Sequence, residues 1–315
     1  MPKKTLLVMT SSIMPAEMAR LEEMFDIVRL WKEPDPDAAI RRHQNDIVAA
    51  ISGIKSGASA QLIEALPNLE IIAQNGVGVD NIDLEAARRR DIKVVNTPDV
   101  VTEDTADTAL ALLLAVTRRV VEGDMFVRAG FWEKRGTLPR GMSLGGKRAG
   151  IVGLGRIGRA IARRLQAFGI DVVYTGRNPK DDVDYLFYED VAAMATDCDF
   201  LILSCSGGPE TGHLIHTGIF EAMPQHAVLI NVARGSVVDE PALVRALKYG
   251  EISGAGLDVF ADEPYVPEEF KTMDNVVMLP HIGAATRETA ASQGQLIIDN
   301  LAAHFEGRPL LTPVT

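Results

Sequence analysis

Charged and ionisable side chains follow several short apolar segments in the second half of the chain. Arg234 lies in "NVARGSVVDE", Asp258 and Glu263 lie in "GLDVFADEP", and His281 lies in "LPHIGAAT". If each apolar segment is a strand of one parallel sheet, these side chains converge beyond the carboxyl ends of the strands, where open α/β sheets bind their ligands. His281 is the group best suited to proton transfer, because imidazole titrates near neutral pH. The pattern predicts acid–base chemistry beside a bound ligand.

A glycine-rich segment indicates the class of that ligand. In "GLGRIG", Gly153, Gly155 and Gly158 have the GxGxxG spacing, and the segment joins a predicted strand, "RAGIV", to a predicted helix and a further strand, "DVVYT". In this setting the first glycine permits a tight turn, the second lets a pyrophosphate approach, and the third lets helix and strand pack closely. The helix N-terminus offers free N–H groups and a positive dipole to phosphates. The segment predicts a dinucleotide site.

The residues after the second strand of this unit bear on the choice of cofactor. An NAD site usually has Asp or Glu there to bind the ribose 2′-hydroxyl. This chain has Gly176, followed by Arg177, Asn178 and Lys180, and the two cations could pair with a 2′-phosphate. We therefore expect NADP(H) to be preferred, with NAD(H) possible; a solvated basic loop with no preference is the alternative.

The elements that position these residues follow an α/β rhythm. Apolar strand-like runs alternate with amphipathic helical segments over residues 1–99 and again over 100–285, which predicts parallel sheets covered on both faces. A long helix is expected at about 102–121, and another, at 286–307, either caps the second block or returns to the first. The fold class is therefore α/β, with two Rossmann-like or flavodoxin-like domains.

Composition narrows the function further. The 315 residues carry a formal net charge of −11, which argues against nucleic acid or an anionic membrane as the main partner. Cys198 and Cys205 are the two cysteines, in or beside an apolar run, and their spacing predicts neither a disulfide framework nor a metal site. No stretch approaches 18 apolar residues, and no signal peptide is evident. We expect a cytoplasmic protein.

Several motifs in order resemble one enzyme family. The series "NGVGVDNID", "VVTEDTAD", "GIVGLGRIG", "NVARGSVVDE", "GLDVFADEP" and "LPHIGAAT" is similar to the D-isomer-specific 2-hydroxyacid dehydrogenases over residues of about 70 to 290. "YTGR" at 174–177 resembles the NADPH-dependent glyoxylate/hydroxypyruvate reductase branch, to which 2-ketogluconate reductases are close. The resemblance implies reduction of small 2-oxo acids, glyoxylate and hydroxypyruvate first, to D-2-hydroxy acids.

The resemblance also implies roles for individual residues. His281 would protonate the carbonyl oxygen as hydride arrives, Glu263 would stabilise its charged form, and Arg234 would clamp the substrate carboxylate. The backbone N–H groups of Val77 and Gly78 would complete carboxylate binding. The remaining cofactor contacts implied by the family are Thr102, Arg156, Ile157, Ser206, Val232 and Asp258. No metal is expected.

The family's domain organisation predicts a substrate-binding domain of residues 1–99 plus 286–315 and a dinucleotide-binding domain of 100–285. The active site is then expected in the interdomain cleft, and the helix at 102–121 in the core of a homodimer. Ala284 and Leu138 differ from the residues typical of the glyoxylate/hydroxypyruvate reductase branch, so the identity of the preferred substrate stays open. Three alternatives stay open: a 2-ketogluconate reductase, an NAD-dependent D-2-hydroxyacid or phosphoglycerate dehydrogenase, and a cofactor-sensing binding protein like the C-terminal-binding corepressors.

Overall fold

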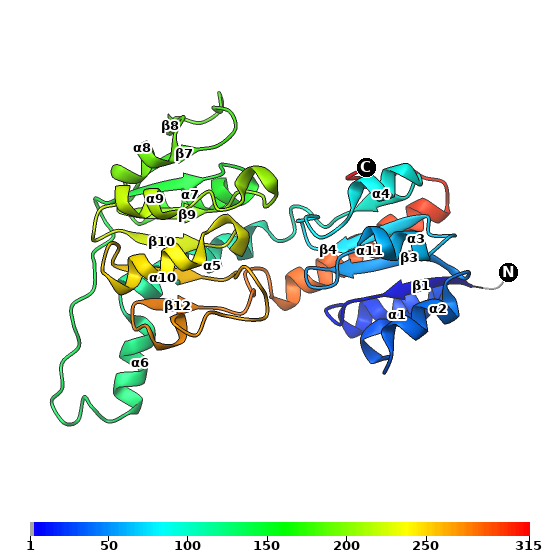
Figure 1. Ribbon diagram of the computed structural model, residues 1–315, viewed down its shortest axis with the longest axis horizontal. Helices are drawn as coiled ribbons and strands as arrows, with labels where there is room; N and C mark the ends of the chain where they lie inside the picture. The colour runs from blue at the N-terminus through cyan, green and yellow to red at the C-terminus, as the bar shows by residue number, and fades with distance from the viewer. Residues whose placement is uncertain (1–2) are drawn as a thin grey trace. The chain divides into compact units, whose positions relative to one another are not determined.

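The structure, a computed structural model, describes residues 3–315. The chain divides into two compact units: unit 1 comprises the residues up to Val101 together with Ala284–Thr315, and unit 2 comprises Thr102–Gly283. Each unit contains one parallel β-sheet covered by helices (Figure 1). The expected α/β class with two parallel sheets is therefore confirmed. The binding roles predicted for the two domains, and the predicted cleft, stay predictions.

Unit 1 has a five-stranded sheet with the order β2-β1-β3-β4-β5, in which all neighbouring strands are parallel. This is the flavodoxin-like order, in which the chain reverses its direction of winding between β1 and β3. The strands are β1 (Lys4–Val8), β2 (Phe25–Arg29), β3 (Ile47–Gly53), β4 (Ile71–Asn75) and β5 (Lys93–Val95). The helices are α1 (Pro15–Met24), α2 (Pro36–His43), α3 (Ala60–Ala65), α4 (Leu84–Arg89) and α11 (Arg287–Phe305).

Two apolar layers cover the two faces of this sheet. On one face, residues of α3 and α4 such as Ile63 and Ala87 pack against alternate strand residues. On the other face, Leu21 of α1 and Leu301 of α11 pack against the intervening ones. Side chains alternate between the faces of a strand, so both layers draw on the same strands. The C-terminal helix α11, left open by the residues alone, thus belongs to unit 1.

Unit 2 has a seven-stranded sheet with the order β12-β11-β10-β9-β6-β7-β8, again parallel throughout. The winding reverses between β6 and β9, as in Rossmann domains. Its strands are β6 (Arg148–Val152), β7 (Asp171–Thr175), β8 (Leu186–Tyr188), β9 (Phe200–Leu203), β10 (Val228–Asn231), β11 (Gly254–Leu257) and β12 (Val276–Met278). Its helices are α5 (Thr102–Thr117), α6 (Val120–Arg128), α7 (Arg156–Ala167), α8 (Val191–Thr196), α9 (Thr217–Ala222) and α10 (Glu240–Lys248).

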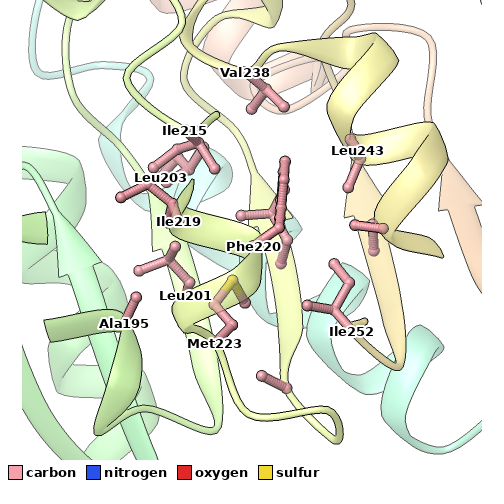
Figure 2. Close-up of a cluster of buried hydrophobic side chains, with 14 of the residues drawn as sticks. Ala195, Leu201, Leu203, Ile215, Ile219, Phe220, Met223, Val238, Leu243 and Ile252 are labelled. Carbon is pink, nitrogen blue, oxygen red and sulfur yellow. The ribbon is translucent and has the colours of Figure 1, made fainter. Parts of the chain in front are cut away.

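The core of unit 2 also has two layers. Helices α5 and α7 cover one face of the sheet, where Leu113 and Leu165 are fully buried. Helices α8, α9 and α10 cover the other, where Phe220 of α9 lies among strand residues (Figure 2). The loops at the carboxyl edge of this packed sheet carry Arg234, Glu263 and His281.

The predicted C-terminal end of the helix at 102–121 is wrong. Helix α5 stops at Thr117, Arg119 takes a left-handed conformation with φ of +53°, and a separate helix, α6, begins at Val120. The apolar residues of α5 pack inside unit 2, whereas α6 and the segment after it run out from the sheet (Figure 1). Strand β2 and helices such as α2 and α6 were not predicted. No helix among residues 3–315 is long and apolar enough to cross a membrane.

Candidate active site

Three adjacent strands of unit 2 deliver the predicted catalytic residues to one edge of the sheet. Arg234 follows β10, Glu263 follows β11, and His281 follows β12. These strands are neighbours in the sheet and run parallel, so their carboxyl ends open on the same side. This order of strands explains why the three segments, which are far apart in the sequence, end at the same edge of the sheet.

His281 and Glu263 form a close pair. The imidazole Nδ1 of His281 lies 2.7 Å from Oε2 of Glu263, and both side chains are largely buried, with 16% and 17% of their surface exposed. The other carboxylate oxygen of Glu263 accepts a hydrogen bond from the N–H of Phe260 at 3.2 Å. Because the carboxylate occupies Nδ1, it orients the ring and leaves Nε2 as the nitrogen available to a ligand.

Asp258 holds the segment that carries His281. Its carboxylate oxygens accept the backbone N–H groups of Ile282 and Gly283, each at 2.8 Å. His281 itself has φ of +58°, a left-handed conformation that an ordinary residue adopts at a cost, so these bonds help to maintain it. Asp258 is 2% exposed, and this burial raises the pKa of its carboxyl against the opposing effect of the two N–H groups.

The turn that carries Arg234 is fixed by the buried residue Asn231. The Asn231 side chain donates from Nδ2 to the carbonyl of Arg234 and accepts at Oδ1 from the N–H of Ala233, both at 3.0 Å. Gly235 then passes so close to the next loop that a β-carbon there would lie 1.8 Å from the carbonyl carbon of Phe260. Only glycine allows this approach, and it brings the Arg234 and Glu263 loops together.

Glu240, the first residue of α10, joins the same two loops. Its Oε1 accepts the N–H of Ala261 at 2.8 Å, two residues before Glu263. Burial raises the pKa of Glu240; the Ala261 N–H lowers it, and the nearby Asp262 and Glu263 carboxyls raise it again. The site therefore contains three carboxyls, those of Asp258, Glu240 and Glu263, and each of them accepts at least one backbone N–H group.

The glycine-rich turn lies at the reversal point of the sheet, between β6 and β9. Gly153 has φ of +95°, and a β-carbon there would lie 2.7 Å from the backbone of Cys205. A β-carbon on Gly158 would lie 2.3 Å from the carbonyl oxygen of Gly153, whereas Ser204 donates its hydroxyl to that same oxygen at 2.9 Å. The turn is thus tight, and it is closed on one side by the loop after β9.

The residues of this turn fit a dinucleotide. A β-carbon built on Gly155 would meet no atom within 4 Å, so the space in front of its backbone is open to a phosphate. Helix α7 begins at Arg156 with no side-chain cap on its first N–H groups, and its 12 residues align their dipoles toward this point. Ile157 is half-buried at the same helix start. An open backbone beside an uncapped helix N-terminus is suited to a pyrophosphate.

The other residues predicted to bind cofactor also follow strands of unit 2, or begin its first helix. Arg177, Asn178 and Lys180 are exposed after β7, and the N–H of Lys180 donates to the Tyr174 hydroxyl at 2.7 Å. Ser206 is exposed after β9, and its carbonyl accepts from the Thr211 hydroxyl. Val232 directly follows β10, and Thr102 is the first residue of α5.

Val77 and Gly78 belong to unit 1. They follow β4 at the carboxyl edge of that sheet, where Val77 is 37% exposed and Gly78 is half-buried. Gly76 starts the turn, with its N–H donating to the hydroxyl of Thr97 at 3.0 Å. The loop is therefore anchored to the strand-end segment after β5.

Three residues of the site were not predicted. Asn231, Ser204 and Glu240 all bind backbone groups of the loops that carry the predicted residues. For Asn231 and Ser204 the signal in the sequence was a polar residue directly at the end of an apolar run, in "VLIN" and "LILS". Such residues cap the loop that follows, because the end of a strand leaves backbone groups without ladder partners.

Two further observations concern metal-ligating groups and the cysteine thiols. Among residues 3–315, no group of three or more His, Cys, Asp or Glu residues could hold a metal ion. Both cysteines are free, and burial raises the pKa of the thiol to about 12 for Cys198 and to about 11 for Cys205. The thiols are therefore poor nucleophiles at neutral pH, and the ionisable groups of the site are the histidine and the carboxyls.

Comparison with known proteins agrees with this geometry. Residues 110–283, which span the glycine-rich turn, Arg234, Glu263 and His281, match the family described as D-isomer specific 2-hydroxyacid dehydrogenase, NAD binding domain. The chain belongs to this family. It is an NAD(P)-dependent oxidoreductase, and its reaction class interconverts 2-oxo acids and 2-hydroxy acids. The residues that match this NAD binding domain include the glycine-rich turn of unit 2.

Relatives of this 2-hydroxyacid dehydrogenase extend over nearly the whole chain. Glyoxylate/hydroxypyruvate reductase A of Arabidopsis thaliana is 45% identical over 93% of this chain and 94% of its own length. The 2-ketogluconate reductase of Gluconobacter oxydans is 43% identical over 96% of each. The NADPH-dependent glyoxylate/hydroxypyruvate reductase of Sinorhizobium meliloti, solved in complex with NADP and malonate, is 40% identical with a TM-score of 0.90, over 99% of this chain and 97% of its own.

Proposed function

We propose that this dehydrogenase uses NADPH to reduce small 2-oxo acids, glyoxylate and hydroxypyruvate first, to D-2-hydroxy acids. The observation that carries the proposal is the His281–Glu263 pair, 2.7 Å apart and beside the Arg234 turn. A paired acid and a guanidinium are the groups that reduction of a 2-oxo acid needs. The relatives named for glyoxylate and hydroxypyruvate support the choice of substrate.

His281 is the proton donor in this proposal. Reduced nicotinamide, when bound, would supply the hydride that the carbonyl carbon of the substrate accepts. Nε2 of His281 gives a proton to the carbonyl oxygen, and Glu263 stabilises the imidazolium before that transfer. Asp258 keeps the donor in place through the backbone of residues 282 and 283. In this proposal Asp258 is also a cofactor contact, at the nicotinamide amide.

Arg234 and unit 1 bind the substrate carboxylate. The guanidinium of Arg234 takes the carboxylate and polarises the adjacent carbonyl, because its fork of donors matches two acceptor oxygens. The N–H groups of Val77 and Gly78 complete carboxylate binding. These contacts make a 2-oxo acid a better substrate than an aldehyde or ketone without a carboxylate. Arg234→Lys, which keeps the charge but loses the fork, should raise KM for the acid by about tenfold or more.

The basic loop after β7 selects the cofactor in this proposal. Arg177 and Lys180 pair with the 2′-phosphate of NADPH, and no acid stands at Gly176 to favour a ribose hydroxyl. Arg156 and Ile157 receive the pyrophosphate with the three glycines. Thr102, Asn178, Ser206 and Val232 complete the cofactor contacts. The solved relative in complex with NADP supports this preference.

The experiment is a matrix of two cofactors and four acids. Purified protein is mixed with NADPH or NADH and with glyoxylate, hydroxypyruvate, pyruvate or 2-ketogluconate, and the loss of nicotinamide absorbance is followed. We expect fast turnover with NADPH and glyoxylate or hydroxypyruvate. Arg177→Ala should then raise KM for NADPH about tenfold to a hundredfold and leave KM for NADH unchanged, since a bond to a charged group is lost. Equal effects on both cofactors would remove Arg177 from this role.

The relative from Gluconobacter oxydans makes 2-ketogluconate reduction the second candidate. A kcat/KM for 2-ketogluconate above that for glyoxylate would replace the proposed substrate without changing the residues. Preference for NADH would overturn the cofactor assignment alone. Cofactor binding without turnover of any acid would favour a cofactor-sensing protein.

We also propose that the enzyme acts as a homodimer in the cytoplasm. We place the dimer interface on the exposed apolar residues of α6 and the segment after it, because the apolar residues of α5 pack inside unit 2. Met125 and Trp132 are 64% and 69% exposed there. Light scattering should give twice the chain mass, and Trp132→Asp should lower it.

A further inference from the structure

Gln74, at the carboxyl end of β4, is a buried amide with both ends engaged. It is 1% exposed. Its Oε1 accepts from the hydroxyl of Ser52 on β3, and its Nε2 donates to the carbonyl of Gly78 at 3.1 Å. A carbonyl oxygen can only accept, so the amide must present its nitrogen to Gly78. The side chain thus reaches forward over the turn that follows its own strand.

The neighbouring carbonyls of this turn are held as well. The carbonyl of Val77 accepts from Nδ2 of Asn96 at 2.7 Å, and that of Gly76 accepts from the N–H of Thr97 at 3.0 Å. Three successive carbonyl groups, from Gly76 to Gly78, are therefore bound within unit 1.

This anchoring decides where the N–H groups point. In a trans peptide the C=O and the N–H lie on opposite sides, so the N–H groups of Val77, Gly78 and Val79 face away from the donors that hold the carbonyls. Among residues 3–315, no protein acceptor takes any of these three N–H groups. Such a run of oriented, unused donors is suited to an anion.

Gly78 needs an anchor on each side. Glycine has the widest range of backbone conformations, so one fixed peptide group does not determine the orientation of the next. Asn96 holds the peptide group before Gly78, and Gln74 holds the one after it. Loss of either amide would let the turn rotate without disturbing the sheet hydrogen bonds of β4.

We propose that Gln74 is a positioning residue for substrate binding, which acts through the carbonyl of Gly78 to hold the N–H groups of the 77–79 turn toward the substrate carboxylate. The inference rests on the proposed function, in which Val77 and Gly78 bind that carboxylate. It adds a residue that does not contact the substrate but contributes to substrate binding. Its chemistry is specific: an amide donor is needed at this position, and an apolar side chain of the same length cannot replace it.

The test compares two variants of nearly the same size. Gln74→Met removes the donor at every pH, and KM for glyoxylate should rise about tenfold while KM for NADPH stays within about twofold. Gln74→Glu supplies a donor only when the introduced carboxyl is protonated. Its KM for glyoxylate should therefore fall as the pH is lowered and become smaller than that of Gln74→Met. If the introduced carboxyl acted only by repelling the substrate, KM of Gln74→Glu for glyoxylate would fall at low pH to the value of Gln74→Met and not below it.

Asn300→Asp is the matched control. Asn300 is another fully buried amide of unit 1, whose side chain binds residues 311 and 312 instead of the 77–79 turn. It should lower the free energy of unfolding without a selective rise in KM for glyoxylate. A Gln74→Met protein that is folded and keeps the wild-type KM for glyoxylate would overturn the proposal, and so would parallel rises in KM for glyoxylate and NADPH.

A second readout separates this inference from the proposed function. Hydrogen–deuterium exchange of the peptide that contains residues 76–79 is followed with NADP⁺ present, with and without glyoxylate. We expect glyoxylate to slow exchange in the wild-type protein and not in Gln74→Met. Equal protection in both proteins, or protection in neither, overturns the role of Gln74. Failure of the proposed function is recognised separately, as absence of turnover in the unaltered protein.

Discussion

His281 Nδ1 lies 2.7 Å from Glu263 Oε2, although 18 residues separate the two in the chain. The two residues follow the adjacent strands β11 and β12, and the second carboxylate oxygen of Glu263 accepts the N–H of Phe260 in its own loop. Unit 2 contains a second pair of the same chemistry at the opposite edge of the sheet, where His226 Nε2 lies 2.7 Å from Asp199 Oδ1. The two pairs allow a matched comparison.

Glu263→Gln should lower kcat by about tenfold to a hundredfold, because a neutral amide stabilises the imidazolium of His281 less than a carboxylate does. His281→Ala should remove most of the turnover. The double variant should be little worse than His281→Ala alone, since Glu263 acts through the imidazole. Steady-state kinetics at saturating substrate measure these effects. His226→Ala is the control, and a comparable loss of kcat there would show that the effect is not local to His281.

Gly283→Ala should disturb His281 through Asp258. A β-carbon at this position would lie 2.8 Å from Oδ2 of Asp258, so the carboxylate or the 281–283 segment must shift. We expect kcat to fall by about tenfold and the free energy of unfolding to fall by about 1–3 kcal/mol. Gly212→Ala is the comparison, since its β-carbon would come no nearer than 3.7 Å to any neighbour. Equal kinetic effects of the two substitutions would refute the link.

Glu240 should make stability depend on pH. Burial is the largest influence and raises the pKa of Glu240 above its usual value of 4.5. The native state then holds the proton more firmly than the unfolded state, so the contribution of this group to stability falls as the pH rises from about 4.5 through the raised pKa. In Glu240→Gln this loss is absent, and the gain in unfolding free energy over the wild-type protein should grow between pH 4.5 and 7.

Urea unfolding at several pH values measures this difference. The glutamine retains an oxygen for the N–H of Ala261, so kcat should change little, whereas Glu240→Ala frees that N–H and should lower kcat. Glu268→Gln, on a side chain that is 84% exposed, serves as the control. A gain that shrinks as the pH rises would contradict the assigned sign.

Cys205 should resist alkylation in the native protein. Burial raises the pKa of its thiol to about 11, so little thiolate is present at pH 8. Reaction with iodoacetamide at pH 8 should be at least about tenfold slower than for an exposed thiol, and its rate should keep rising between pH 9 and 10. Mass spectrometry of labelled peptides gives the rate, with the protein in urea as reference. Labelling that levels off below pH 9 would be inconsistent with the raised pKa.

Much of the site could be predicted from the residues because its positions are encoded locally. A strand followed by GLGRIG and a helix specifies a turn, and Arg234, Glu263 and His281 each end an apolar run. Parallel strands open at one edge, so these ends could be expected to meet. Strand β2 shows the limit, since Phe25 continues directly from α1 with no glycine or proline to mark the change of period.

The contacts that position the reacting groups depend on the tertiary structure. Whether Glu240 reaches Ala261, or Asn96 reaches Val77, is set by the order of the strands, the length of each loop and the packing beneath it. The break of the long helix at Arg119 comes directly after Thr117, the last buried residue of α5. Periodicity and turn chemistry act between close neighbours in the chain, and the sequence alone determined those. Hydrogen bonds between distant segments need positions accurate to a fraction of an ångström, which only the packed fold provides.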